Sequence, residues 1–217
     1  MTTDDLPVGP VAVRVAILVL IVAACPQLHA QAQAQLPGGD VLIVTGAEVS
    51  LRTRESTRTV AAPQDLSRQL SRARERFFVG TSGSPITGAN YVVLVVQTPS
   101  TDTRATGYCG AGTEDTLYVL ELRRSPLRLI PRDRLLLQSC VDSLSLADDT
   151  GTPLRTRLER SATAGCITLQ WLGHPRFGDD AVSLRIESGK LHEGCALQPS
   201  TQRAPSKAPT KQGELAD

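Results

Sequence analysis

Cysteine is the residue type in this sequence with the widest choice of chemistry, because a thiol can form a disulfide, bind a metal or act as a nucleophile. The chain of 217 residues has five cysteines, and no two of them form a Cys-x-x-Cys pair. The sequence therefore predicts no metal site. A catalytic thiol is not expected either, because such a thiol needs a histidine partner and only His174 and His192 follow the N-terminal region.

The four cysteines after the N-terminal region are predicted to form two disulfides. These residues are Cys109, Cys140, Cys166 and Cys195. An even number of cysteines in an exported chain is typical of a disulfide framework. Four cysteines allow three connectivities, and the sequence leaves all three open. The sequential pairing Cys109–Cys140 and Cys166–Cys195 is preferred, because it closes loops of 30 and 28 intervening residues, each long enough for about two strands.

Arginine side chains gather in one stretch of the chain. Between Arg52 and Arg76 there are seven arginines and three acidic residues, a local charge of +4, whereas the whole chain has a net charge of only +1. The candidate binding residues are those on or next to the predicted helix, namely Arg68, Arg72, Arg74 and Arg76. Such a face suits an acidic protein, a lipid headgroup or an anionic glycan. The alternative is a solvated face whose arginine stems cover apolar surface.

Nucleic acid is not an expected partner. Lysine is scarce in the chain, aromatic residues make up only 3% of it, and the basic stretch lacks interleaved stacking residues. A mean hydropathy of −0.09 also excludes a protein with many membrane spans.

A hydrolase is the second interpretation. Its Ser/His/carboxylate site would use one residue of each type from Ser82 or Ser84, His174 or His192, and Glu114 or Asp179. The segment Gly80–Ser84 does not match Gly-x-Ser-x-Gly, since residue 84 is serine. No spacing brings titratable groups together in the sequence, so we predict no catalytic residue and no cofactor, and favour a protein that is not an enzyme.

A glycine-rich segment, Cys109-Gly-Ala-Gly-Thr-Glu-Asp115, precedes a predicted strand and is interpreted as a tight turn. Together with Leu137-Gln-Ser-Cys140 and Ile167-Thr-Leu-Gln-Trp171, this segment resembles uncharacterised exported proteins of proteobacteria over about residues 107–195. The resemblance implies an exported location. It implies no activity and transfers no functional residue.

The N-terminal region has the pattern of a secretory signal. An uninterrupted apolar run from Val15 to Cys25 is too short to span a bilayer and has the length of a signal-peptide core. Small residues allow cleavage after Ala30, Ala32 or Ala34. We therefore expect a signal peptide over 1–34, one β-rich domain over 35–197 and a disordered tail over 198–217, with no membrane span after cleavage.

Two alternatives to soluble export remain open at this end of the chain. Val22-Ala23-Ala24-Cys25 is similar to a bacterial lipobox, in which Cys25 would carry a lipid. The apolar run could also remain as an uncleaved anchor. The expected location is accordingly the periplasm or the exterior, or the outer membrane for a lipoprotein.

Apolar periodicity predicts a mainly β (α+β) fold. Leu66, Leu70, Ala73 and Phe77 share one face of a helix predicted over 61–79, which is the one helix expected. The chain before it, 31–39, is interpreted as a polar lead-in. Strands are predicted at 41–44, 48–53, 91–97, 116–122, 134–146, 166–172 and 181–186, with a bulge or bend near 141–144. They would form an antiparallel sheet or sandwich with two disulfides.

These observations together predict an exported cell-envelope binding protein that is not an enzyme, with an inhibitor or an immunity-type protein as concrete forms. The sequence names no ligand and no oligomeric state. The rival interpretations are the secreted hydrolase described above and a structural lipoprotein anchored at Cys25.

Overall fold

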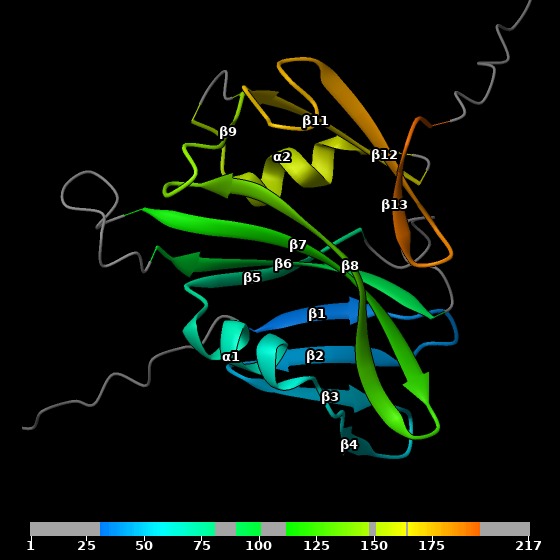
Figure 1. Ribbon diagram of the computed structural model, residues 1–217. Helices are drawn as coiled ribbons and strands as arrows, with labels where there is room; N and C mark the ends of the chain where they lie inside the picture. Colours follow the sequence, from blue (N-terminus) through cyan, green and yellow to red (C-terminus); the bar gives the residue numbers. More distant parts are fainter. Residues whose placement is uncertain (1–30, 81–89, 101–111, 148–150, 164, 196–217) are drawn as a thin grey trace, which may run out of the picture.

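The computed structural model describes residues 31–80, 90–100, 112–147, 151–163 and 165–195, which form three antiparallel sheets and two α-helices (Figure 1). The first sheet has the order β1-β2-β3-β4, with β1 Ala32–Gln35, β2 Val41–Thr45, β3 Glu48–Arg52 and β4 Thr57–Thr59. The second has the order β5-β6-β7-β8, with β5 Glu75–Val79, β6 Tyr91–Pro99, β7 Thr113–Arg124 and β8 Leu127–Ser139. The third has the order β10-β11-β12-β13, with β10 Ala162–Thr163, β11 Cys166–Leu172, β12 Ala181–Glu187 and β13 Lys190–Glu193, and β9 Ser145–Leu146 also pairs with β11.

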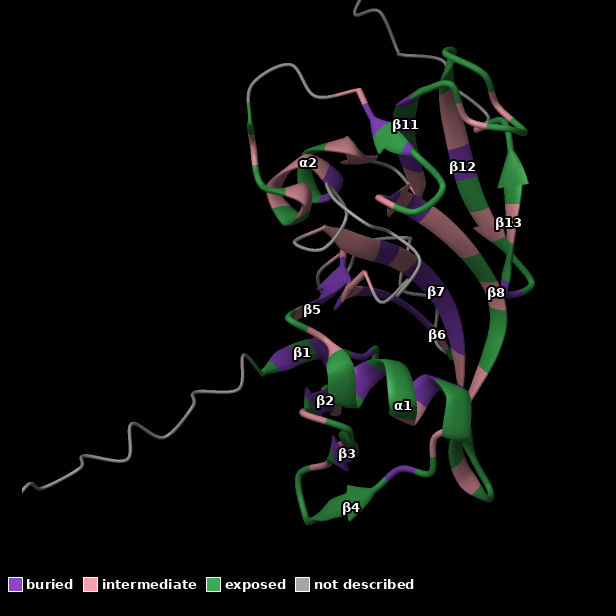
Figure 2. Cartoon of the chain, turned by 60° about the vertical axis from the view of Figure 1, so that its left-hand side comes forward, coloured by how far each residue is buried: buried purple, intermediate pink, exposed green. Residues whose placement is uncertain are grey.

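The second sheet lies between two apolar cores (Figures 1 and 2). β5, β6 and the middle of β7 are buried on both faces, whereas most residues of β8 are exposed or half-buried. Phe78 and Leu94 point into the first core, which they share with β1, β2, β3 and α1. Phe77 and Val95 point into the second core, which they share with α2, β9, β11 and β12. Neighbouring residues of a strand point to opposite faces, so a strand buried on both faces needs apolar residues at successive positions. The first six residues of β6 are accordingly Tyr-Val-Val-Leu-Val-Val.

The prediction of a mainly antiparallel β protein is confirmed, with three antiparallel sheets. The finer prediction of a sandwich is not confirmed. Strands predicted at 41–44, 91–97, 116–122, 166–172 and 181–186 all lie in strands of the structure, and the strand predicted at 48–53 runs one residue past the end of β3. β12 and β13 form a hairpin, in which Glu187 lies opposite Lys190.

β1 contradicts the prediction of a polar lead-in, and it begins three residues before the predicted domain boundary at residue 35. The strand pairs with β2 along its whole length. Ala32 and Ala34 are 0% and 3% exposed, whereas Gln33 and Gln35 are exposed. The alternation was there in the sequence, but alanine is a small residue of low β propensity, so it did not indicate a buried strand.

The predicted helix over 61–79 was wrong after residue 72. α1 spans Gln64–Arg72 and buries Leu66 and Leu70 as predicted, with Asp65 in its first turn. The next residue, Ala73, is extended, and the chain continues directly into β5. Phe77, Phe78 and Val79 favour a strand through their bulky side chains, and pairing with β6 buries all three.

A second helix, α2 at Leu154–Ser161, was not predicted, so the expectation of one helix was wrong. Leu158 is fully buried in the second core, and Leu154 packs against the same core one turn earlier. With only two leucines among mostly polar and charged residues, the helix has too narrow an apolar stripe to stand out in the sequence.

β8 departs from the strand predicted over 134–146. It begins earlier, at Leu127, and ends at Ser139, after which the chain turns through Ser143 with φ 54° before β9. The irregularities of the β7–β8 pairing lie within β8 itself, where Arg132 and Leu137 have no opposite residue. Of the bulge or bend predicted near 141–144, the structure has the change of chain direction, as a turn, and no bulge of the pairing.

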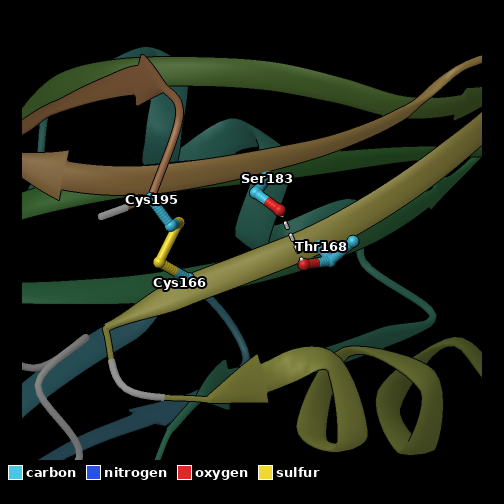
Figure 3. Close-up of a disulfide and its surroundings, with 4 residues drawn as sticks. All are labelled: Cys166, Thr168, Ser183 and Cys195. Atoms are coloured by element: carbon cyan, nitrogen blue, oxygen red, sulfur yellow. Dashed lines mark hydrogen bonds between the residues drawn. A yellow bond between two sulfur atoms is a disulfide. The ribbon is translucent and has the colours of Figure 1, made fainter. Parts of the chain in front are cut away.

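One disulfide joins described residues, Cys166–Cys195, with the two Cα atoms 6.0 Å apart (Figure 3). It ties the start of β11 to the segment after β13, and Thr168 of β11 hydrogen-bonds Ser183 of β12 at 3.0 Å nearby (Figure 3). Cys166–Cys195 is one of the two disulfides of the preferred sequential pairing, and this part of the prediction is confirmed. Cys140 is disulfide-bonded as well, but Cys109 lies outside the described residues, so the pairing Cys109–Cys140 stays a prediction.

Candidate functional site

A groove of about 360 Å³ lies between α1 and the β7–β8 pair, and we call it the α1 groove. Its polar lining consists of Asp65, Arg68, Gln69, Tyr118 and Arg134. Its apolar lining consists of Pro63, Leu66 and Pro131. Of the residues predicted to bind a partner, Arg68 is the one that lines this groove.

The bulge at Arg132 determines which residues of β8 reach the groove. In a regular strand, positions 131 and 134 would face opposite sides of the sheet, because they are three residues apart. The extra residue restores the phase, so that Pro131 lies opposite Leu120 and Arg134 lies opposite Tyr118. Leu120 and Tyr118 both belong to the first core, and therefore Pro131 and Arg134 both lie on the α1 side of the sheet.

Tyr118 forms the floor of the α1 groove and is only 8% exposed. Its hydroxyl makes no hydrogen bond with any described residue. Burial raises the pKa of this phenol, the positive charge of Arg134 lowers it, and the negative charge of Asp65 raises it. Both charges thus act directly on the ring, which remains a neutral hydrogen-bond donor at neutral pH.

The rim of the α1 groove has an excess of positive charge. Arg68 pairs with Asp65 at 3.4 Å, and the two side chains are 62% and 93% exposed, so water screens this pair strongly. Arg134 is exposed and has no ion pair among the described residues. Two guanidinium groups against one carboxylate leave a net charge of +1, which favours an anionic ligand.

The structure separates the four arginines predicted to form one basic face. Arg68 and Arg72 lie one turn apart on α1 and are exposed, as Figure 2 shows for the outer side of this helix. Arg74 is exposed just before β5. Arg76 does not belong to this face, because the chain is a strand there and its side chain turns inward.

Arg76 is a structural residue and is only 5% exposed. Its guanidinium donates hydrogen bonds to the carbonyl oxygens of Gly46 at 2.8 Å and Ala73 at 3.0 Å. These bonds connect the β2–β3 turn to the end of α1. Burial lowers the pKa of Arg76, because the charged form loses its hydration.

The residues proposed for a hydrolase are only partly described. His174 and Asp179 lie in the β11–β12 loop, and each uses its side chain to hold backbone N–H groups of that loop. His174 Nδ1 accepts from Arg176 at 3.0 Å and from Phe177 at 3.2 Å. Burial, and then the charge of Arg176, lower the pKa of this histidine.

Two of the remaining hydrolase candidates, His192 and Glu114, lie outside this loop. His192 lies opposite Arg185 in the β12–β13 pair, and Glu114 accepts a hydrogen bond from the Val141 N–H at 3.4 Å. Ser82 and Ser84 lie outside the described residues. In the described part of the chain, no group of three or more His, Cys, Asp or Glu side chains is arranged to hold a metal ion.

A row of polar residues crosses the second sheet on its other face. Glu75 lies opposite Gln97, Gln97 opposite Asp115, and Asp115 opposite Gln138. From α2, Arg157 donates to the Gln138 side chain at 2.8 Å and covers the end of the row. Asp115 is 0% exposed, and neither of its carboxylate oxygens has a hydrogen-bond partner in the described part of the chain.

Burial raises the pKa of the Asp115 carboxyl, and the charges of Glu114 and Glu75 raise it further. The side chains of Gln97 and Thr113 lie close enough to oppose this shift, but neither makes a hydrogen bond of normal geometry to the carboxylate. Asp115 therefore destabilises the folded state when it is ionised.

We expect Asp115→Asn to increase the free energy of unfolding by about 1 kcal/mol or more at pH 7. Below about pH 3 the carboxyl is mostly neutral in both states, so there is no buried charge to destabilise the fold. As the pH rises, the unfolded carboxyl ionises first, so wild-type stability falls until the pH passes the raised pKa of the folded state. Urea unfolding at several pH values measures this difference.

The matched control is Asp142→Asn, because Asp142 is exposed. It should change stability by less than about 0.5 kcal/mol at every pH. An advantage of Asp115→Asn that does not shrink on acidification would mean that the charge of Asp115 is not its cause.

The sequence indicated Arg68 as a candidate but gave no sign of Tyr118 or Arg134. Tyr118 lies within an apolar strand and reads as a core residue. Arg134 comes near Arg68 only through the register of β7 and β8 and the bulge between them. Neither helix of the described residues has the length and hydropathy that crossing a membrane requires.

Comparison of the chain with known protein families, with curated proteins and with solved structures finds no match. The resemblance to exported proteobacterial proteins therefore stays a prediction. The class that the structure itself defines is a disulfide-bonded, mainly antiparallel β protein with a small cationic groove.

Proposed function

We propose that this chain is an exported binding protein of the cell envelope that is not an enzyme and that recognises an acidic partner through the α1 groove and the adjoining outer side of α1. The observation that carries this proposal is the position of Arg68 and Arg134 on the rim of one groove, with a net positive charge. Arg72, one turn after Arg68, extends the same surface and has no ion pair among the described residues.

The envelope location is supported by the disulfide Cys166–Cys195, since disulfides persist in oxidising compartments and are rare in the cytosol. The exposure of Arg68 and Arg72 supports a binding role. An arginine whose guanidinium stabilises the fold is buried, as Arg76 is. Arg68 and Arg72 are instead exposed, so a partner can reach their charges.

We expect Arg68→Glu combined with Arg72→Glu to weaken binding of an acidic partner about tenfold at low ionic strength, because two attractive charges become repulsive. The free energy of unfolding should change by less than about 0.5 kcal/mol. The measurement is the binding of three probes to the domain: a short labelled Glu-rich peptide, vesicles containing an anionic phospholipid, and alginate.

A charge-matched control is Arg160→Glu combined with Lys190→Glu, since both residues are exposed and far along the chain from α1. This variant has the same net charge but should keep the wild-type affinity. Equal loss of binding in both variants would show a non-specific charge effect, and no binding of any probe by the wild type would contradict the proposed function.

A further inference from the structure

The α1 groove contains a polar group that the fold itself does not satisfy. Tyr118 is more than nine-tenths buried, yet its hydroxyl has no hydrogen-bond partner among the described residues. Most of the Tyr118 ring is covered, but the hydroxyl oxygen is not one of the fully buried unpaired atoms, so it stays accessible from the groove. In the free protein water can pair with it, and a ligand that replaces this water must offer an acceptor of its own. The α1 groove opens above this hydroxyl, and therefore a ligand can supply this acceptor.

The groups around the hydroxyl select the charge of that ligand. The charges of Arg134 and Asp65 both act on the phenol of Tyr118, and Arg68 holds Asp65 in an ion pair. That pair is exposed and strongly screened by water, whereas Arg134 has no ion pair among the described residues, so Arg134 is the cation most available to an incoming group. A carboxylate can accept from the guanidinium of Arg134 and from the hydroxyl of Tyr118 at once.

The apolar lining of the groove favours a ligand whose carboxylate has an apolar group beside it. Pro63 and Leu66 form the α1 side, and Pro131 forms the β8 side. A volume of about 360 Å³ is at the lower end for small-ligand pockets, so it has room for a short piece of chain only. A carboxylate with an apolar neighbour matches both parts of this lining.

We infer that the α1 groove binds an acidic peptide segment in which an aspartate or glutamate stands next to an apolar residue. The carboxylate lies between Arg134 and the Tyr118 hydroxyl, and the apolar side chain lies against Leu66 and Pro131. This inference rests on the proposed function, and it narrows the acidic partner to a protein. Tyr118 is then a specificity residue, because its hydroxyl lies inside the groove and donates only to an acceptor group that enters the groove.

The test uses three labelled peptides with the wild-type domain and measures fluorescence anisotropy. One peptide repeats Leu-Glu, the second has serine in place of leucine at the same charge, and the third has glutamine in place of glutamate. The Leu-Glu peptide should bind about tenfold more tightly than either of the others, since each of them removes one of the two matched features.

Tyr118→Phe should weaken binding of the Leu-Glu peptide about tenfold and leave the glutamine peptide unchanged, because only a charged acceptor gains strongly from the hydroxyl. Arg134→Gln should have a similar selective effect. The matched control is Tyr91→Phe, at a partly buried tyrosine that packs against the second core. That variant should bind all peptides as the wild type does.

The outcomes separate this inference from the proposed function. If acidic peptides bind and Arg68→Glu with Arg72→Glu weakens them, but neither Tyr118→Phe nor the exchange of leucine for serine has an effect, the inference is overturned and the proposed function stands. If the domain binds only vesicles or alginate, the inference is likewise overturned. If nothing acidic binds, both fail.

Discussion

Replacing Ala34 by glutamate is expected to lower the free energy of unfolding by about 3–5 kcal/mol, a large part of the stability of an ordinary domain. Ala34 is 3% exposed and packs in the first core beside β2. The new carboxylate would be buried there without a partner, and the small space left by alanine would also be overfilled. Urea unfolding followed by circular dichroism measures the change.

The control for this prediction is the preceding residue of the same strand. Gln33 is exposed, so Gln33→Glu adds the same group on the other face of β1 and should cost less than about 0.5 kcal/mol. Equal effects of the two variants would mean that β1 is not a buried strand.

The place of β1 also bears on how the proposed export signal is removed. Cleavage after Ala34 would leave only Gln35 of the strand, and cleavage after Ala32 would remove its first buried residue. Cleavage after Ala30 would keep β1 whole. Of the three sites that the sequence allows, we therefore expect the first to be used.

The second large effect is expected at Trp171, the single tryptophan of the chain. Its ring is 0% exposed, it stacks on Phe177 with ring centres 5.1 Å apart, and its indole N–H donates to the Leu137 carbonyl oxygen at 2.9 Å. Trp171 thus joins β11 of the third sheet to β8 of the second. Trp171→Ala should cost about 3–5 kcal/mol, because it leaves a cavity and removes this link.

Circular dichroism, rather than fluorescence, is the suitable measurement here, because the variant has no tryptophan. The matched control is Leu172→Ala at the next residue, which is 59% exposed and should cost less than about 0.5 kcal/mol. A cost below about 1.5 kcal/mol for Trp171→Ala would show that the third sheet does not depend on this contact.

Local sequence patterns were sufficient to predict a strand that has one buried face and one exposed face. β11 is the clearest case, because Ile167, Leu169 and Trp171 alternate with polar residues, and its predicted bounds are those of the structure. Local patterns failed to predict the secondary structure or burial of residues for which these depend on contacts with distant parts of the chain. The two alanines of β1 are buried only because β2 lies beside them, and Phe77 fits the apolar phase of a helix as well as a buried strand.

The candidate site shows the same division. Arg68 could be chosen from the sequence, since the basic stretch and the helical period are both local properties. Tyr118 and Arg134 could not, because they meet across a strand pair whose register includes a bulge at Arg132. Arg76 was misplaced for a related reason, since the helix ends before it and the strand that follows turns its side chain inward.

The second sheet gives one of its faces to each apolar core, and this has a consequence for how the molecule comes apart. If the elements around either core unfolded alone, one face of the second sheet would become exposed to water. Phe78 would be exposed on the side of the first core, or Phe77 on the side of the second core. Heating should accordingly produce one calorimetric transition rather than two, although the described residues form three separate sheets. A destabilising substitution in either core should then lower the stability of the whole molecule. Substitutions in the edge strands β4 and β13 should be tolerated best.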